Sequence, residues 1–405
     1  MGEDMIFTNK QLSNYADVLV WAMEKARRGG KFKKYDQILV RYDNAALPLA
    51  QAVYERLLQK KYLPTARTTM PEELQRSFYT LADEKQLKHI SAGEAAFQES
   101  LNGLIALHAP QDLTALKSVD PARIGTAAVA RKSLREVLDK TEQAGLFSWT
   151  LCNYPTEEQA AKAGLTLKQY AAQIAKACFL NDKNPLQKWE EVMAQITEIG
   201  HWLNSLKIHT LHVQSQNMDF EILLGEKRKF ISGGGNNIPS FEIFTSPDWR
   251  GTKGVYFADL SSYRTGNYVK AVRLEFKKGR VVKATAEAGQ DYLRKMLAMD
   301  RGASQIGEFS LTDRRFSKID KFMADILFDE NFGGKYGNCH VAVGSSYADT
   351  YDGDMSKLDK KLKEKLGYND SSLHWDLINT ENKSVHATLT NGKKVLIYEK
   401  GQFKY

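Results

Sequence analysis

The run Ser371-Ser372-Leu373-His374-Trp375-Asp376-Leu377 surrounds one imidazole and one carboxyl group with apolar and aromatic side chains. This composition predicts a buried strand. Because residues i and i+2 of a strand point to the same face, His374 and Asp376 would converge on one point. An unpaired charge buried there is costly, so the pair needs a partner. A divalent metal ion is one such partner, and a hydrogen-bonded His–Asp pair inside the core is the alternative.

The sequence around this run, from about residue 208 onward, is rich in strand patterns. Strand-like segments occur at residues 210–213, 254–257, 269–276 and 280–286, with turn residues between them. Residues 385–389 and 394–398 flank Asn391-Gly392, which is a strong hairpin signal. We therefore expect residues 208–405 to form a β-rich α+β domain that carries the metal site.

The preceding half alternates between helical and strand patterns. Helices are predicted at residues 11–27, 46–60, 71–84 and 121–144, and strands at 37–42, 104–107 and 147–151. Such alternation predicts an α/β layer with a largely parallel sheet. Residues 1–207 should form this domain, with 155–206 as a helical connector. We find no glycine fingerprint for a dinucleotide, so this half indicates no chemistry of its own.

The composition is that of an ordinary globular protein, with 405 residues of which 42% are hydrophobic and 26% are charged. No apolar run reaches the roughly 20 residues that a membrane span needs. The acidic start, Met1-Gly2-Glu3-Asp4-Met5, lacks the order of a secretion signal. Three cysteines provide no disulfide framework, which favours the cytoplasm. Cys339 beside His340 has no protease signature around it, so a small buried thiol is the better interpretation.

The net charge of +8 raises the question of nucleic acid or a membrane surface as a partner. The basic runs at residues 31–34, 227–229 and 360–363 are scattered, and the last has acidic neighbours. Solvated faces explain them better. Because no zinc finger, RNA-recognition signature or P-loop occurs, we expect neither nucleic acid nor a membrane as a partner.

Further candidate ligands lie in the second half, each flanked by apolar residues or glycine. They are Glu242, Glu308 and His340, which join His374 and Asp376. Taken singly, a glutamate is usually a surface charge and a histidine near a strand is usually a core residue. As a set, two glutamates, two histidines and an aspartate are the ligand mix that suits Zn, Co or Mn.

Five stretches resemble the signature blocks of the thermophilic metalloprotease family, which comprises aminopeptidases T, S and II. They are NNIPSFEIFTSPD, GASQIGEFSLTD, LFDEN, CHVAVGSSY and SSLHWDL, at residues 236–248, 302–313, 327–331, 339–347 and 371–377. The resemblance implies that Glu242, Glu308, His340, His374 and Asp376 hold two divalent ions (Zn, Co, Mn or Mg). It also implies that Tyr347 is the catalytic tyrosine, and that the protein is a homodimer with an internal cavity.

Two features depart from the family pattern. Phe241 stands where the family has a second acidic residue beside Glu242. The glycine-rich residues 333–337 resemble an insertion that would alter the rim of the pocket. Asp352 is a weaker candidate for an extra acidic group near the metals, and Asp219 is expected to be structural.

The expected activity is that of a metalloaminopeptidase acting on short peptides through a metal-bridged hydroxide. With five side chains for two ions, at least one carboxylate would bridge. Tyr347 would donate to the oxyanion, and Glu242 or Glu308 would carry a proton to the leaving amine. A dinuclear amidohydrolase with a non-peptide substrate is the alternative enzyme, and a metal-stabilised binding protein is the non-catalytic one.

Overall fold

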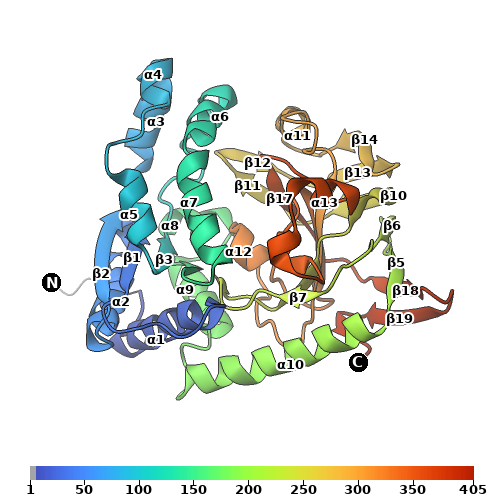
Figure 1. Ribbon diagram of the computed structural model, residues 1–405, viewed down its shortest axis with the longest axis horizontal. Helices are drawn as coiled ribbons and strands as arrows, with labels where there is room; N and C mark the ends of the chain where they lie inside the picture. The colour runs from blue at the N-terminus through green and yellow to red at the C-terminus, as the bar shows by residue number, and fades with distance from the viewer. Residues whose placement is uncertain (1–5) are drawn as a thin grey trace. The chain divides into compact units, whose positions relative to one another are not determined.

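The computed structural model describes residues 6–405, apart from the side chain of Ser356 (Figure 1). The acidic start considered above therefore lies outside the described residues. The chain divides into two compact units. The first runs from the start of the described chain to Trp189 and adds Gly234–Pro239 and Thr265–Asn267. The second comprises Glu190–Gly233, Ser240–Arg264 and Tyr268–Tyr405.

The first unit contains one five-stranded sheet whose strands all run parallel, in the order β2-β1-β3-β4-β8. Its strands are β1 (Gln37–Tyr42), β2 (Leu63–Thr68), β3 (Gly103–His108), β4 (Ser148–Asn153) and β8 (Asn237–Ile238). This confirms the predicted α/β class and the largely parallel sheet. The sequence analysis missed β2, because its residues LPTART are mostly exposed or half-buried on an edge strand and show no apolar alternation.

Helices surround this sheet, and α1 and α2 lie beside each other in the blue part of Figure 1. The helices are α1 (Asn9–Ala26), η1 (Asn44–Ala46), α2 (Leu47–Gln59), α3 (Glu72–Leu81), α4 (Glu84–Leu87), α5 (Glu94–Ser100), α6 (Pro121–Ala130), α7 (Lys132–Gln143), α8 (Glu157–Lys162) and α9 (Leu167–Ala177). Thr8 begins α1 with a capping box, in which its hydroxyl accepts from Gln11 N. Tyr15 on α1 donates to Asn153 O at 2.9 Å, which fixes the helix against β4.

One helix prediction of the first unit needs correction. Residues 121–144 form two helices, α6 and α7, and not one. Arg131 lies between them with φ −83° and ψ 0°, as the C-cap of α6 and the N-cap of α7. The hydrophobic periodicity continues across Arg131, so the pattern by itself did not reveal the break.

The long helix α10 (Pro185–Ser205) connects the two halves of the sequence. The predicted domain boundary near residue 207 lies at the end of α10, whereas the division into compact units falls near its start, between Trp189 and Glu190.

The second unit contains two antiparallel sheets. The eight-stranded sheet has the order β14-β13-β10-β6-β5-β18-β19-β20, and the five-stranded sheet has the order β17-β16-β15-β9-β7. The strands of the first are β5 (Ile208–Gln214), β6 (Asp219–Leu223), β10 (Asp248–Ala258), β13 (Val272–Lys277), β14 (Arg280–Thr285), β18 (Ser384–Leu389), β19 (Lys394–Glu399) and β20 (Gln402–Phe403). The strands of the second are β7 (Ile231–Ser232), β9 (Glu242–Thr245), β15 (Ile306–Thr312), β16 (Asn338–Gly344) and β17 (His374–Asn379).

The two sheets pack on each other through apolar side chains such as Phe220, Phe309 and Val341, all fully buried. Tyr256 on β10 crosses between them, because its hydroxyl donates to Leu377 O on β17 at 2.6 Å. The five-stranded sheet is thus supported from behind, and its other face is available for polar side chains.

The remaining elements of the second half are short. They are β11 (Ser262–Arg264), β12 (Asn267–Val269), α11 (Gln290–Leu297), α12 (Ile326–Asp329), η2 (Ala348–Thr350), η3 (Met355–Lys357) and α13 (Lys360–Lys365). The single strand predicted at 269–276 is wrong, since the chain turns at Ala271, whose φ is 54°, and β13 begins after it. A left-handed alanine interrupts a strand although its side chain fits the β pattern. Within residues 6–405, no helix combines the length and apolarity needed to cross a membrane.

Candidate metal centre

The five predicted ligands come from four adjacent strands of the five-stranded sheet. Glu242 lies on β9, Glu308 on β15, His340 on β16, and His374 and Asp376 on β17. Glu308, Ala342 and Asp376 are direct partners in one row across β15, β16 and β17. Directly paired residues of a sheet point to the same face, so the ladder register brings these side chains together. The small side chain of Ala342 separates the two carboxylates.

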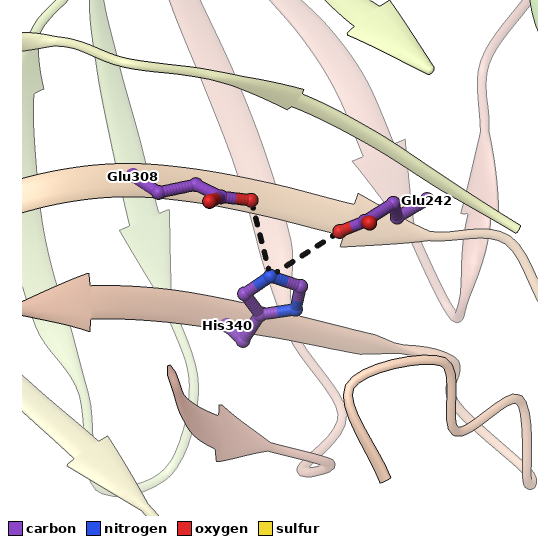
Figure 2. Close-up of side chains that lie close together, drawn as sticks. All are labelled: Glu242, Glu308 and His340. Carbon is purple, nitrogen blue, oxygen red and sulfur yellow. Dashed lines mark hydrogen bonds and ion pairs between the residues drawn. The ribbon is translucent and has the colours of Figure 1, made fainter. Parts of the chain in front are cut away.

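We call Glu242, Glu308, His340, His374 and Asp376 the ligand cluster. His340 Nε2 lies 3.3 Å from Glu242 Oε2 and 3.3 Å from Glu308 Oε1, and Figure 2 shows the three side chains converging. His374 Nε2 lies 3.4 Å from Glu308 Oε2 and 3.5 Å from Asp376 Oδ1. The cluster therefore contains two groups with suitable spacing for a metal, and Glu308 belongs to both.

A fourth acidic residue, Glu330, lies beside the cluster and was missed by the sequence analysis. It is 8% exposed and directly follows α12. Burial, and then the charges of Glu242 and Asp376, hold the pKa of its carboxyl group well above the usual range. The LFDEN block that contains Glu330 was noticed, but a single glutamate within a short helical turn gave no sign of where its side chain points.

The electrostatics of the cluster indicate a need for cations. Burial is the main reason that the pKa of Glu242 rises to about 7. Burial alone would lower the pKa of His340, but the hydrogen bond to Glu308 and the nearby carboxylates raise it to about 9. When fully ionised, the carboxylates of Glu242, Glu308, Glu330 and Asp376 carry four negative charges. Two divalent cations would balance them while both imidazoles stay neutral, as metal ligands must be.

Neighbouring groups orient the donor atoms of the cluster. His374 Nδ1 lies 2.9 Å from Ser345 O, and since a carbonyl only accepts, this nitrogen carries the proton and Nε2 is left for a metal. Ser310 Oγ donates to Glu242 Oε2 at 3.0 Å. His340 Nδ1 has no hydrogen-bond partner among the described residues. Two of the ligands thus have the supporting hydrogen bonds that metal-binding side chains commonly show.

Tyr347 lies at the rim of the cluster, three residues after β16, with 44% of its surface exposed. Its ring packs edge-on against His374, with 4.7 Å between the ring centroids, and against Phe244 at 5.7 Å. Its backbone N–H donates to Ser246 Oγ at 2.8 Å. Desolvation of the phenol by the protein around it, and then the charges of Glu308 and Asp376, hold its pKa well above the ordinary value. Tyr347 therefore stays protonated and can donate a hydrogen bond.

The weaker candidates lie elsewhere in the second unit. Asp219 is on β6 of the other sheet, where Oδ1 lies 2.7 Å from His212 Nε2. Asp352 is exposed on the loop after η2. In the glycine-rich segment 333–337, the backbone N–H groups of Gly333 and Gly334 both donate to Ile319 O. This segment forms the approach to β16, and therefore to His340.

Replacing Gly344, which is not itself a predicted ligand, with alanine should displace ligands of the cluster. Gly344 ends β16 with φ +108°, and an added Cβ would lie 2.0 Å from Leu373 O, beside His374. The clash must displace β17, so we expect metal affinity to fall by about tenfold to hundredfold. Calorimetric titration with Zn²⁺ measures this. Gly392→Ala is the control, because Gly392 also has positive φ (+83°) but open space around it. Equal affinities in the two variants would contradict the prediction.

The pH dependence of stability should differ with and without metal. In the metal-free protein, the raised pKa values mean that the folded state binds more protons than the unfolded state. This holds between about pH 4.5 and pH 7 for Glu242, and between about pH 6.5 and pH 9 for His340. Stability should therefore fall as pH rises through this window. Divalent ions replace these protons, so the increase in Tm on adding Zn²⁺ should be larger at pH 8.5 than at pH 6, by at least about 5 °C. A metal-induced increase that is constant with pH would contradict this.

The chain is similar to known proteins over nearly its whole length. The family model described as thermophilic metalloprotease (M29) matches residues 8–403. Aminopeptidase AmpS of Bacillus subtilis is 25% identical over 426 residues, covering 98% of this chain and 99% of the relative. Aminopeptidase 2 of Geobacillus stearothermophilus is 28% identical over 351 residues, covering 81% of each chain. The structure of wild-type AmpT from Thermus thermophilus superposes with a TM-score of 0.80 at 22% identity, covering 98% of this chain and 100% of that one.

Proposed function

Because the chain belongs to the thermophilic metalloprotease family, we propose that it is a metal-dependent aminopeptidase that removes N-terminal residues from short peptides. The aminopeptidase names of the relatives support the class of reaction. The observation that carries the proposal is the position of Glu308, whose two oxygens each face a different imidazole within one cluster of buried carboxylates. A carboxylate in this position could serve both ions of a dinuclear site.

The ligand cluster would hold two divalent ions. Glu242, Glu308 and His340 would hold one ion, and Glu308, His374 and Asp376 the other, with the carboxylate of Glu330 beside them. When bound, such ions activate water and polarise the scissile carbonyl. Nitrogen and carboxylate ligands suit Zn, Co or Mn, and the general affinity order does not select among them.

The residues of this chain would contribute orientation and hydrogen bonding. Tyr347, protonated at the rim of the cluster, would donate to the oxygen that becomes negative during attack on the peptide carbonyl. Glu242 and Glu308, the two expected proton carriers, both face imidazoles, so we assign them first as ligands. The proposal includes a homodimer in the cytoplasm, which rests on the family resemblance and on the absence of a disulfide framework.

The test is hydrolysis of leucine p-nitroanilide by protein stripped with a chelator and then resupplied with Zn, Co, Mn or Mg. We expect activity to be lost on stripping, restored by metal, and absent with the N-acetylated substrate. His374→Ala should be inactive, whereas His386→Ala, a half-buried histidine on β18 of the other sheet, should match the wild type. Equal cleavage of the N-acetylated substrate, or no turnover despite bound metal, would favour the amidohydrolase or binding-protein alternatives.

A further inference from the structure

Strand β17 lies at one end of the five-stranded sheet and also carries two of the predicted ligands. Its only neighbour in the order of the sheet is β16. His374 and Asp376 both belong to it. The outer side of such an edge strand presents backbone N–H and C=O groups that have no partner within the sheet. The candidate metal centre therefore lies beside a strand edge.

A backbone bond at the end of β17 shows which of its groups face this edge. Ile378 O accepts from Leu260 N at 3.3 Å. Leu260 follows β10, a strand of the eight-stranded sheet, so this bond is made on the outer side of β17. Backbone groups alternate between the two sides of a strand. The N–H and C=O groups of Asp376 and His374 therefore face outward, as those of Ile378 do.

The covering of the outer edge by Leu260 ends at Ile378. Within residues 6–405, no strand or isolated bridge pairs with the outer side of β17. The opposite direction of the alternate groups is visible at Leu373, whose O accepts from Ser345 N at 2.7 Å on the side of β16. Outward groups recur about every 6.6 Å along a strand. Those of residues 374 and 376 thus match the repeat of an added strand.

The ligand cluster becomes more exposed toward this same edge. On the other side of the cluster, the side chains of His340 and Glu242 are 1% and 7% exposed. On β17, those of Asp376 and His374 are 13% and 24% exposed. Tyr347, which packs on His374, is 44% exposed. A substrate thus reaches the cluster from the side of β17, and the part of a peptide that the metals do not hold extends to that side.

We propose that an extended peptide substrate adds to the outer edge of β17 as a short strand, with its amino end at the ligand cluster. Main-chain bonding to an exposed sheet edge is a recurring mode of peptide recognition. Such bonds do not depend on side chains, so residues after the first would be accepted with little regard to their identity. This inference rests on the proposed aminopeptidase function, and it identifies how that same site holds the rest of the substrate.

The first experiment replaces single amides of a peptide with esters, which removes one N–H without adding bulk. The substrates are leucyltriglycinamide and its two analogues with glycolate in place of the third or the fourth residue. A paired strand uses the backbone groups of every second residue. We therefore expect kcat/KM for release of leucine to fall by about threefold to tenfold for one analogue, and by less than about twofold for the other. Equal effects of the two esters would overturn the inference.

The second experiment measures amide hydrogen exchange along β17 in the metal-loaded protein. The probe is leucyltriglycinamide with its first peptide bond reduced, which cannot be cleaved. Without it, the amides of His374 and Asp376 should exchange faster than those of Trp375 and Leu377, which face β16. With it, at least one of the two outward amides should slow by about tenfold or more, while the two inward amides serve as controls.

Two results of the exchange experiment would contradict the inference. Slow exchange of both outward amides without the peptide would show that the edge is already covered, by this chain or by a second copy. Unchanged exchange at a concentration of the peptide that inhibits hydrolysis of leucine p-nitroanilide would show that the peptide binds elsewhere. Cleavage of leucine p-nitroanilide also separates the two proposals. If it is cleaved while the esters have equal effects, only the edge pairing is wrong, and if no substrate is cleaved, both proposals fall.

Discussion

Replacing Glu308 with glutamine should remove both metal-binding groups at once and lower kcat/KM by at least about 10³-fold, since metal activation contributes several kcal/mol and each 1.36 kcal/mol is a factor of ten. The reason is geometric. Oε1 of Glu308 faces His340 and Oε2 faces His374, so this carboxylate is common to both groups. An amide has one oxygen, which cannot face two cations as an acceptor.

The measurement is metal content after dialysis, together with hydrolysis of leucine p-nitroanilide. Glu242→Gln is the informative comparison, because Glu242 belongs to one group alone. We expect Glu242→Gln to retain about one metal equivalent and Glu308→Gln to retain less. Glu275→Gln, on the solvent-facing side of β13, controls for the loss of a carboxylate elsewhere in the unit. Two tightly bound ions in Glu308→Gln would show that Glu308 is not the bridge.

Replacing Tyr347 with phenylalanine should lower kcat by about 10²–10³-fold, the usual effect of removing one oxyanion donor. The ring contacts with His374 and Phe244 are made by carbon atoms and would remain. The backbone N–H bond to Ser246 would remain as well. Only the phenol hydroxyl is removed, so metal content and KM should change little.

Tyr351→Phe is the control for this prediction. Tyr351 is four residues further along the chain and 3% exposed, and it packs in a separate apolar cluster with Leu358, Leu366 and Tyr368. Its hydroxyl should have no effect on kcat. If Tyr347→Phe kept full activity, Tyr347 would have no role in the reaction. If it lost metal instead, the hydroxyl would act in metal binding and not at the oxyanion.

Elements with strong local signals were predictable from the sequence. Strand 37–42 was predicted with the bounds that β1 has, and the Asn391-Gly392 hairpin between β18 and β19 was found from its turn. Elements whose formation depends on contacts with other parts of the chain were not predictable from the sequence. The edge strand β2 forms because β1 offers it a parallel partner, and the breaks at Arg131 and Ala271 are single backbone torsions within patterns that continue.

The site shows the same division between local and long-range information. The types of ligand were readable, because imidazole and carboxylate groups flanked by apolar residues are unusual along any chain. The pairing of His374 with Asp376 followed from the two-residue period of a strand. The importance of Glu330 was not readable, since its proximity to Glu242 and Asp376 depends on where α12 lies against the sheet.

The sequence by itself therefore determined which chemical groups are present, the strands that carry most of them, and the family to which the chain belongs. Only the tertiary structure decided which of these groups lie together in each candidate metal-binding group. Residues 242, 308, 340 and 376 are far apart in sequence, and the ladder register of β9, β15, β16 and β17 places them on one face. Register is a property of paired strands, and no single strand contains it. For that reason the position of Glu308 between the two imidazoles became visible only in the folded chain.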